Sequence, residues 1–332
     1  MDADEQVKDL DLSTFLATAS GIEAELHKVI IGQEGLVHDL LVTLLAGGNA
    51  LLEGVPGLGK TLLVRTLAHV IDCSFSRIQF TPDLMPADIV GTMVLTETAA
   101  GHRGFRFEPG PVFANLVLAD EVNRAAPRTQ SALLEAMQEH EATIAGKSHP
   151  MPSPFFVLAT QNPIEMEGTY PLPEAQVDRF LYKIDVPYPT EEELVRIALH
   201  TTTGSSASLV KVADSARVLA MQSLAMKVPV VEEIVRYVAC IVRATHAGDR
   251  NATDGVSRHV RLGASPRGAQ AVIWAAKVEA ILAGRKSVAV QDVRRVAYPA
   301  LRHRMILNFE AQAEGIPPDS ILDKVLAQVQ VP

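Results

Sequence analysis

Residues 54–61 combine three glycines with a lysine and a threonine in an order that suits phosphate binding. They match the pattern G-x-x-x-x-G-K-[ST] in full and read Gly54-Val55-Pro56-Gly57-Leu58-Gly59-Lys60-Thr61. Glycines let the backbone curl so that successive N–H groups point at a chain of phosphates, while Lys60 reaches the β- and γ-phosphates and the Thr61 hydroxyl ligates Mg²⁺. The alternative is a glycine-rich turn with a solvated lysine. The strand-like run before the motif and the helical run after it favour a nucleotide site.

The apolar run 116–119 ends in two adjacent carboxylates, Asp120 and Glu121. Ligands of open α/β sheets bind at the carboxyl ends of the strands. Asp120 is therefore placed to hold Mg²⁺, directly or through water, and Glu121 to act as the general base that polarises an attacking water. Such a run can also be a mere strand end, but the complete glycine-rich motif upstream favours the catalytic interpretation.

Asn162 follows another apolar run, 155–160, and could orient the water or contact the γ-phosphate. The alternative is an asparagine that only serves the turn before Pro163. The sequence contains no Asn/Thr-Lys-x-Asp motif of guanine-binding proteins, so we expect ATP rather than GTP.

The elements that must position these residues alternate between strands and helices. Continuous apolar runs of strand length predict buried parallel strands, and amphipathic runs predict helices between them, which together indicate a doubly wound α/β domain. The strands are expected at 49–53, 75–80, 116–119, 155–160 and 181–186, the helices at 12–47 (interrupted at Gly32), 60–71 and 128–138, and hairpins at 91–111 and 142–152.

The pattern becomes helical beyond residue 190. Thr190 and Glu193 form a capping box at the start of a helix, so we place a domain boundary between residues 1–189 and 190–332. Ser265-Pro266-Arg267 reads as the N-cap, N1 and N2 positions of another helix, and Trp274 on that helix is expected in a core. The predicted helices of this second domain are 191–201, 212–225, 230–247, 266–283 and 290–302.

Composition excludes several classes of protein. Hydrophobic residues make up 48% and charged residues 21% of the 332 residues, which is typical of a globular chain rather than of disorder, collagen or a coiled coil. The acidic start differs from a signal peptide, and no apolar run reaches the roughly 18 residues of a membrane span. We therefore expect a cytoplasmic protein.

Charge is distributed unevenly along the chain. The net charge is −9, which argues against general attraction to nucleic acid. Residues 236–304, however, hold 13 basic and 4 acidic residues. This segment could bind nucleic acid, nucleotide phosphates or an acidic neighbour, or it could simply be a solvated arginine-rich surface.

These motifs make the chain similar to MoxR-type AAA+ ATPases. The similarity is dense up to residue 180 and thins after residue 190 to Gly263-Ala264-Ser265-Pro266-Arg267 and Leu301-Arg302-His303-Arg304. Besides the glycine-rich motif, the dense blocks are Ile30-Ile31-Gly32-Gln33, Phe80-Thr81-Pro82-Asp83-Leu84, Phe107-Glu108-Pro109-Gly110-Pro111, 118–124, 130–137, 159–163 and 167–180.

The resemblance implies a fold and further site residues. The fold would be an αβα core with a five-stranded parallel sheet, a helix-2 insert near 91–110, a pre-sensor hairpin near 141–154 and a helical lid. Asn162 resembles the sensor-1 residue, Arg179 the arginine finger and Arg267 the sensor-2 arginine, with Arg124 a second candidate for acting on a neighbour. By the same resemblance Ile31, Gly32 and Leu62 join the nucleotide-binding residues.

The resemblance also implies an activity and partners. We expect an ATP- and Mg²⁺-dependent ATPase that forms a homo-oligomeric ring, as the family does with six subunits. It would remodel or mature a client complex together with a protein that carries a von Willebrand factor A domain. Two alternatives stay open, an AAA+ nucleic-acid motor and a non-hydrolysing nucleotide switch. The acidic net charge argues against the first, and the presence of Glu121 and Arg179 argues against the second.

Overall fold

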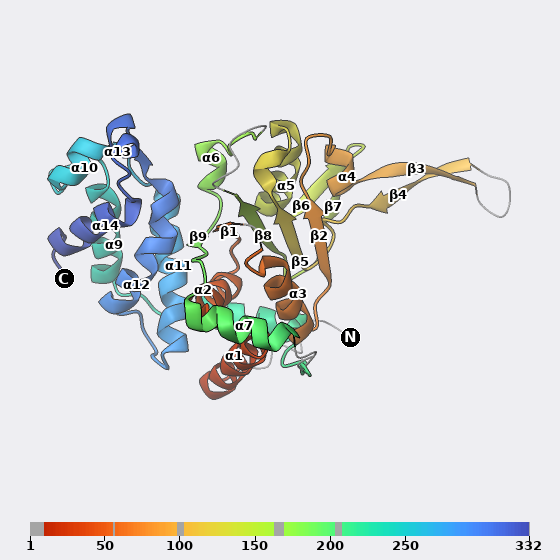
Figure 1. Ribbon diagram of the computed structural model, residues 1–332, viewed down its shortest axis with the longest axis horizontal. Coiled ribbons are helices and arrows are strands. Elements are labelled where there is room, and N and C mark those ends of the chain that lie inside the picture. Colours follow the sequence, from red (N-terminus) through yellow and green to blue (C-terminus); the bar gives the residue numbers. More distant parts are fainter. Residues whose placement is uncertain (1–9, 56, 98–102, 163–168, 203–207, 332) are drawn as a thin grey trace.

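The structure is a computed structural model, drawn in Figure 1. It describes residues 10–55, 57–97, 103–162, 169–202 and 208–331. Pro56 of the glycine-rich motif, Pro163 after Asn162 and the start of the 167–180 block lie outside these ranges. Within them, a sheet flanked by helices is followed by a helical region that stands beside it (Figure 1).

A five-stranded parallel sheet forms the centre of the first region and confirms the predicted fold class. Its strand order is β2-β5-β8-β1-β9, and all four pairings are parallel. Every predicted strand appears within one or two residues of its expected bounds. The strands are β1 (Ala50–Glu53), β2 (Phe75–Gln79), β5 (Leu116–Asp120), β8 (Phe156–Gln161) and β9 (Tyr182–Asp185).

Helices cover both faces of this sheet because alternate strand residues point to opposite sides. Leu116 and Leu118 of β5 pack into a cluster with the helices on one face, whereas Val117 and Ala119 pack into a second cluster on the other. The first face is covered by α1 (Leu12–His27), α2 (Glu34–Leu45) and α3 (Lys60–Val70), and the second by α4 (Pro86–Val90) and α5 (Pro127–Glu139).

The expected break in the first long helical run falls between α1 and α2. Gly32 and Gln33 both adopt left-handed backbone conformations there, with φ of +69° and +55°. A Cβ at Gly32 would displace the carboxylate of Glu193, and the positive φ would strain a residue with a side chain, so glycine is favoured here. The break therefore brings the start of α7 (Glu191–Thr202) against the 30–33 segment.

Two hairpins extend from the first region, as predicted. One pairs β3 (Gly91–Glu97) with β4 (Arg103–Pro109) and projects far from the body of the molecule (Figure 1). The other pairs β6 (Glu141–Ile144) with β7 (Lys147–Pro150). The rings of Phe107 and His149 lie 4.1 Å apart and connect the two hairpins at their bases.

The helical region contains the five predicted helices and further elements that the sequence analysis did not identify. The predicted capping box at the start of α7 is present, since Thr190 N donates to the Glu193 carboxylate at 2.8 Å. The remaining helices are α8 (Ser215–Met226), α9 (Glu232–Ala244), α11 (Pro266–Leu282) and α12 (Val290–Leu301). The additional elements are α10 (Asp254–His259), β10 (Val260–Leu262), β11 (Ile306–Leu307), α13 (Phe309–Ala313) and α14 (Pro318–Gln328).

The helical region packs firmly onto the sheet region. One hydrophobic cluster runs without interruption from α1 and α2 into α8, α9, α11 and α12. The buried carboxylate of Glu279 lies in the same junction, where His38 Nε2 lies 2.8 Å from it and Nε of the exposed Arg295 lies 3.1 Å from it. No helix in the described ranges is both long and apolar enough to span a membrane.

Candidate functional site

A cavity of about 370 Å³ opens at the carboxyl ends of β1, β5 and β8, and we call it the glycine-loop cavity. It brings together most of the residues that the sequence analysis selected. Its lining consists of Gly54, Gly57, Gly59, Lys60, Thr61, Leu62, Arg77, Gln79, Asp120, Glu121, Thr160, Gln161 and Asn162. Three motifs far apart in the sequence therefore meet at one edge of the sheet.

The loop between β1 and α3 has the backbone geometry of a phosphate cradle. Gly57 and Gly59 are left-handed, with φ of +88° and +75°, a conformation that favours glycine. Gly54 passes so close to β9 that a Cβ there would lie 2.9 Å from Cβ of Val186. α3 begins at Lys60, so its unpaired N–H groups and positive end face the cavity.

Lys60 is half-buried beside this loop. Its Nζ donates a hydrogen bond to the carbonyl oxygen of Gly54 at 2.6 Å. Burial lowers the pKa of Lys60, and the nearby charges of Asp120 and Glu121 act in the opposite direction. An anion placed in the cavity would therefore gain a strong partner in Lys60.

Asp120 and Thr160 hold each other at the ends of adjacent strands. Thr160 Oγ1 donates to Asp120 Oδ1 at 2.7 Å and accepts from the backbone N–H of Glu121 at 2.8 Å. Arg77 of β2 forms an ion pair with Asp120 Oδ2 at 2.6 Å. The acidic group that we expect to face a metal is thus paired with a cation of its own chain.

Glu121 occupies a strained backbone position next to Asp120. Its φ is +57°, which is uncommon for a residue with a Cβ and is found preferentially at functional sites. Gln79 Nε2 donates to Glu121 Oε2 at 2.7 Å, and Arg124 Nε lies 3.2 Å from the same oxygen. Asn162, only 7% exposed, also lines the cavity. These carboxylate and amide groups can bind and activate a water beside a phosphate.

The oxygen groups in this cavity fit Mg²⁺. The Thr61 hydroxyl and the Asp120 carboxylate are hard oxygen ligands, and Mg²⁺ is commonly held by one or two carboxylates together with water and phosphate oxygens. Among the described residues no group of three or more histidine, cysteine, aspartate or glutamate side chains forms a self-contained metal site. A nucleotide-dependent Mg²⁺ site is consistent with this donor set.

An apolar cavity of about 340 Å³ adjoins the first and shares Gly57, Gly59 and Leu62 with it. Ile31 and Leu58 line it, whereas Gly32, between the lining residues Ile31 and Gln33, does not. Val55 lines neither cavity. The other lining residues are Val29, Ile30, Gln33, Tyr188, Pro189, Leu194, Ile197 and His200. A flat, largely apolar group attached to the phosphates, such as a nucleobase, would fit here.

Two selected residues, Arg179 and Arg267, lie in a different cavity of about 290 Å³, which we call the arginine cavity. It includes Gly47, Gly48 and Asn49, which precede β1, so it opens near the opposite end of that strand from the glycine loop. Its other lining residues are Met137, Gln138, His140, Asp178, Leu181, Gln270, Ala271, Trp274 and Arg304. The structure therefore does not bring Arg179 and Arg267 to the glycine loop of the same chain.

The arginine cavity also corrects the prediction for Trp274. We expected this side chain in a core, but it is 44% exposed and lines the cavity. The neighbouring residues Ala275 and Ala276 take the buried positions of α11 instead. Arg77, Thr160 and Arg304 were not predicted as site residues. Arg77 and Gln79 alternate along a predicted strand, and this alternation indicates a polar strand face.

Comparisons with known proteins agree with this geometry. Residues 49–182 match the model of the ATPase family associated with various cellular activities (AAA), and residues 254–325 match the AAA lid domain. The chain is 45% identical to the chaperone MoxR1 of Mycobacterium tuberculosis, over 95% of this chain and 85% of that protein. It is 32% identical to the protein MoxR of Paracoccus denitrificans, over 98% and 99%. A crystal structure from Cytophaga hutchinsonii, described as that of a candidate ATPase, has a TM-score of 0.89 at 40% identity and 97% coverage of both chains.

Proposed function

Because the chain belongs to the MoxR family of AAA ATPases, we propose that it binds ATP in the glycine-loop cavity and hydrolyses it as one subunit of a ring. One observation carries this proposal: the glycine loop, Lys60, the Asp120–Glu121 pair and Asn162 line a single cavity. An apolar cavity suited to adenine adjoins it.

The roles of the residues follow from their positions. The N–H groups of the glycine loop and Lys60 bind the phosphates. Thr61 and Asp120 would hold Mg²⁺, which would offset the negative charge of the β- and γ-phosphates. Glu121 accepts a proton from the attacking water, and Asn162 orients that water. Lys60 and Arg77, which contact Gly54 O and Asp120, are the cations beside this site.

Arg179 and Arg267 serve a neighbouring subunit in this proposal. Both guanidinium groups lie in the arginine cavity, away from the glycine loop of their own chain. A head-to-tail ring places the arginine cavity of one copy against the glycine-loop cavity of the next. We expect six subunits, as the family resemblance implies. Arg124 stays a second candidate for acting on a neighbour, and its Nε lies 3.2 Å from Glu121 of its own chain.

The biological role rests on the relatives. One of them is named a chaperone, and we propose a chaperone-like role for this chain. Residues 1–189 would form the nucleotide-binding core and residues 190–332 the helical lid. The hydrolysis cycle would remodel a client complex with the help of a protein that carries a von Willebrand factor A domain.

Calorimetry and phosphate release test the ATPase directly. With Mg²⁺ present, the purified protein should bind ATP and release phosphate. Lys60→Ala should weaken ATP binding by about 100-fold because the main cation facing the phosphates is lost. Lys147→Ala is the matched control, since Lys147 is exposed on β7 and lines neither cavity. An absence of any binding heat with adenine nucleotides would contradict the proposal.

A further inference from the structure

Arg179 and Arg267 reach the arginine cavity from distant parts of the chain. Arg179 lies between α6 (Glu174–Val177) and β9, whereas Arg267 is the second residue of α11. Arg179 NH1 donates to the carbonyl oxygen of Leu134 at 3.2 Å, but this bond leaves its position relative to α11 unspecified. Another contact is therefore needed to fix the position of Arg179 relative to Arg267.

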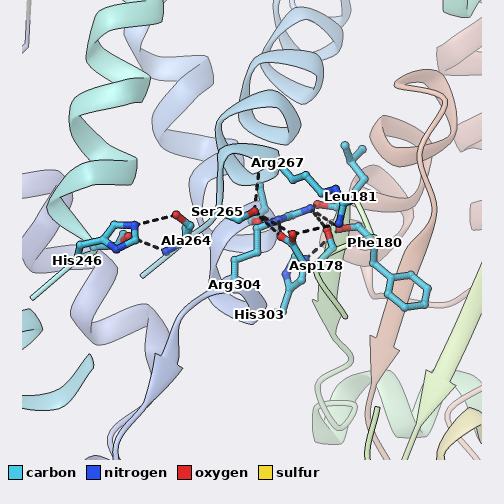
Figure 2. Close-up of polar contacts among 11 residues, drawn as sticks. Asp178, Phe180, Leu181, His246, Ala264, Ser265, Arg267, His303 and Arg304 are labelled. Atoms are coloured by element: carbon cyan, nitrogen blue, oxygen red, sulfur yellow. Dashed lines mark hydrogen bonds and ion pairs between the residues drawn. The ribbon is translucent and has the colours of Figure 1, made fainter. Parts of the chain in front are cut away.

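The carboxylate of Asp178 makes that contact (Figure 2). Ser265 Oγ lies 2.8 Å and 2.9 Å from its two oxygens and donates its hydrogen to them. The same Oγ accepts the backbone N–H of Arg267 at 3.2 Å as the N-cap of α11. Arg267 NH1 itself lies 3.6 Å from Asp178 Oδ2. The residue that precedes Arg179 in sequence therefore binds the first turn of the helix that carries Arg267.

Arg304 fixes the other side of Asp178. Its side chain is almost fully buried, and its Nε donates to Asp178 Oδ1 at 2.9 Å. Its NH2 group donates to the carbonyl oxygens of Asp178 and Phe180 at 2.9 Å and 2.7 Å, and NH1 donates to Leu181 O at 3.1 Å. These carbonyls lie on both sides of Arg179 in sequence. Arg304 therefore clamps the backbone from which Arg179 extends.

The packing around this cluster leaves little freedom. A Cβ at Gly268 would lie 3.0 Å from Leu301 and 3.1 Å from Arg304, so α11 and the segment after α12 approach closely. Burial lowers the pKa of Arg304 to about 10, with the charge of Asp178 acting in the opposite direction. Arg304 therefore stays protonated at neutral pH, and its charge is balanced inside the protein by Asp178.

We propose that Asp178 is a positioning residue that holds Arg179 and Arg267 in one rigid frame, through Arg304 and Ser265, so that both reach the neighbouring subunit's phosphates together. The inference rests on the proposed function, because it assigns to this cluster the task of aiming groups at a nucleotide bound elsewhere. Misplacing a catalytic group by about 1 Å can reduce a rate by roughly 100-fold. A loss of this frame should therefore reduce turnover without changing ATP binding.

Asp178→Asn tests the inference, with Asp185→Asn as its matched control. Asp185 also joins the sheet region to the helical region through an arginine, Arg302 at 2.7 Å, but it lines neither cavity. Asp178→Asn should lower turnover by about tenfold to 100-fold and leave the Kd for ATP unchanged. Asp185→Asn should keep the parental turnover. Equal turnover of Asp178→Asn and the parent would overturn the positioning role.

Mixed rings separate positioning from a general loss of structure. Subunits with Glu121→Gln keep Asp178, Arg179 and Arg267, so they should restore hydrolysis in the intact sites of Asp178→Asn neighbours. Absence of this rescue, with mixed rings verified by sizing, would contradict the inference. If Asp178→Asn does not fold, Ser265→Ala removes the hydrogen bonds to Asp178 together with the N-cap of α11, and leaves the contacts between Asp178 and Arg304 in place. Its loss of turnover should then not add to that of Arg267→Ala, and fully additive losses would contradict the role.

The same experiments distinguish the two proposals. Arg179→Ala with lost turnover and Asp178→Asn with parental turnover would refute only the positioning role. Parental turnover of Arg179→Ala would instead refute donation across the interface, on which the inference depends.

Discussion

The glycine-loop cavity and the arginine cavity are built from opposite kinds of groups. The first presents backbone N–H groups, one lysine, one arginine that is paired with Asp120, and two carboxylates at the carboxyl ends of the strands. The second presents three arginines with a single carboxylate, at the junction of the sheet with the helical region. Phosphoryl transfer needs both the metal-binding acids and additional cations around the phosphate. Each cavity therefore supplies what the other lacks, and one chain does not bring the two together.

The two cavities also differ in how firmly their charged groups are held. In the glycine-loop cavity, Lys60, Arg77 and Gln79 occupy contacts that a nucleotide and Mg²⁺ would replace. In the arginine cavity, Arg304 is buried and bound to Asp178 and to several backbone carbonyls. The charged groups of the glycine-loop cavity are thus held by a few side-chain contacts, whereas Arg304 in the arginine cavity is held by a carboxylate and several backbone carbonyls at once.

Among the substitutions that test this comparison, Arg179→Ala should cause the largest loss of turnover. Turnover should fall by about 1,000-fold or more because the charge on the transferred phosphoryl group loses its partner, while the Kd for ATP stays near the parental value. Steady-state phosphate release and calorimetry measure the two quantities. Arg236→Ala is the control, since Arg236 is an exposed residue of α9. A matching loss of ATP affinity would place Arg179 in its own subunit's site.

Glu121→Gln should have the next largest effect. Removal of the general base should lower turnover by about 100-fold to 10,000-fold, and ATP binding should persist because the cradle and Lys60 are unchanged. Single-turnover hydrolysis of bound ATP measures this step. Glu139→Gln, at the exposed end of α5, should behave as the parent. Parental hydrolysis by Glu121→Gln would show that another group activates the water.

Arg77→Gln should have a smaller effect, and it tests how the charged groups of the glycine-loop cavity are held. Arg77 competes with Mg²⁺ for Asp120, and its side chain is half exposed, so the ion pair has only modest strength. The half-saturating Mg²⁺ concentration for hydrolysis should fall by about threefold. An unchanged or higher Mg²⁺ requirement would mean that Arg77 does not compete with the metal.

His38→Asn should have the smallest effect. It changes the pH dependence of the free energy of unfolding, because His38 lies at the junction between the sheet region and the helical region. Burial favours neutral His38, but hydrogen bonds to Glu23 and Glu279 raise its pKa to about 9, with Arg295 and Asp39 nearby. The folded state therefore binds more protons than the unfolded state between about pH 6.5 and pH 9, so the free energy of unfolding should fall as pH rises through this window.

Urea unfolding of the parent and His38→Asn between pH 6 and pH 9.5 measures this dependence. The parent should lose stability on the order of a few kcal/mol across the window, and the variant should lose less. His27→Asn is the control, because His27 is exposed at the end of α1. Equal slopes for the parent and His38→Asn would show that His38 is not charged in the folded protein.

The sequence predicted the glycine-loop cavity better than the arginine cavity, for a physical reason. Gly54, Lys60 and Asp120 lie at strand and helix ends, and local apolar runs fix those ends. The location of Arg267 depends instead on how α11 packs against α2 and α12, which involves contacts far apart in the chain. Contacts far apart in the chain also decide the exposure of Trp274, which is why its predicted core position was wrong. For the same reason the Asp178–Arg304 pair could not be predicted.

Mixing Glu121→Gln and Arg179→Ala subunits in equal amounts tests the central claim most directly. Each variant alone should be nearly inactive. In random mixed rings, an active site needs an intact Glu121 from one subunit and an intact Arg179 from its neighbour, so about a quarter of the parental phosphate release should return. If rings confirmed to contain both variants show no more activity than the two separate proteins, the two cavities do not complete each other across subunits.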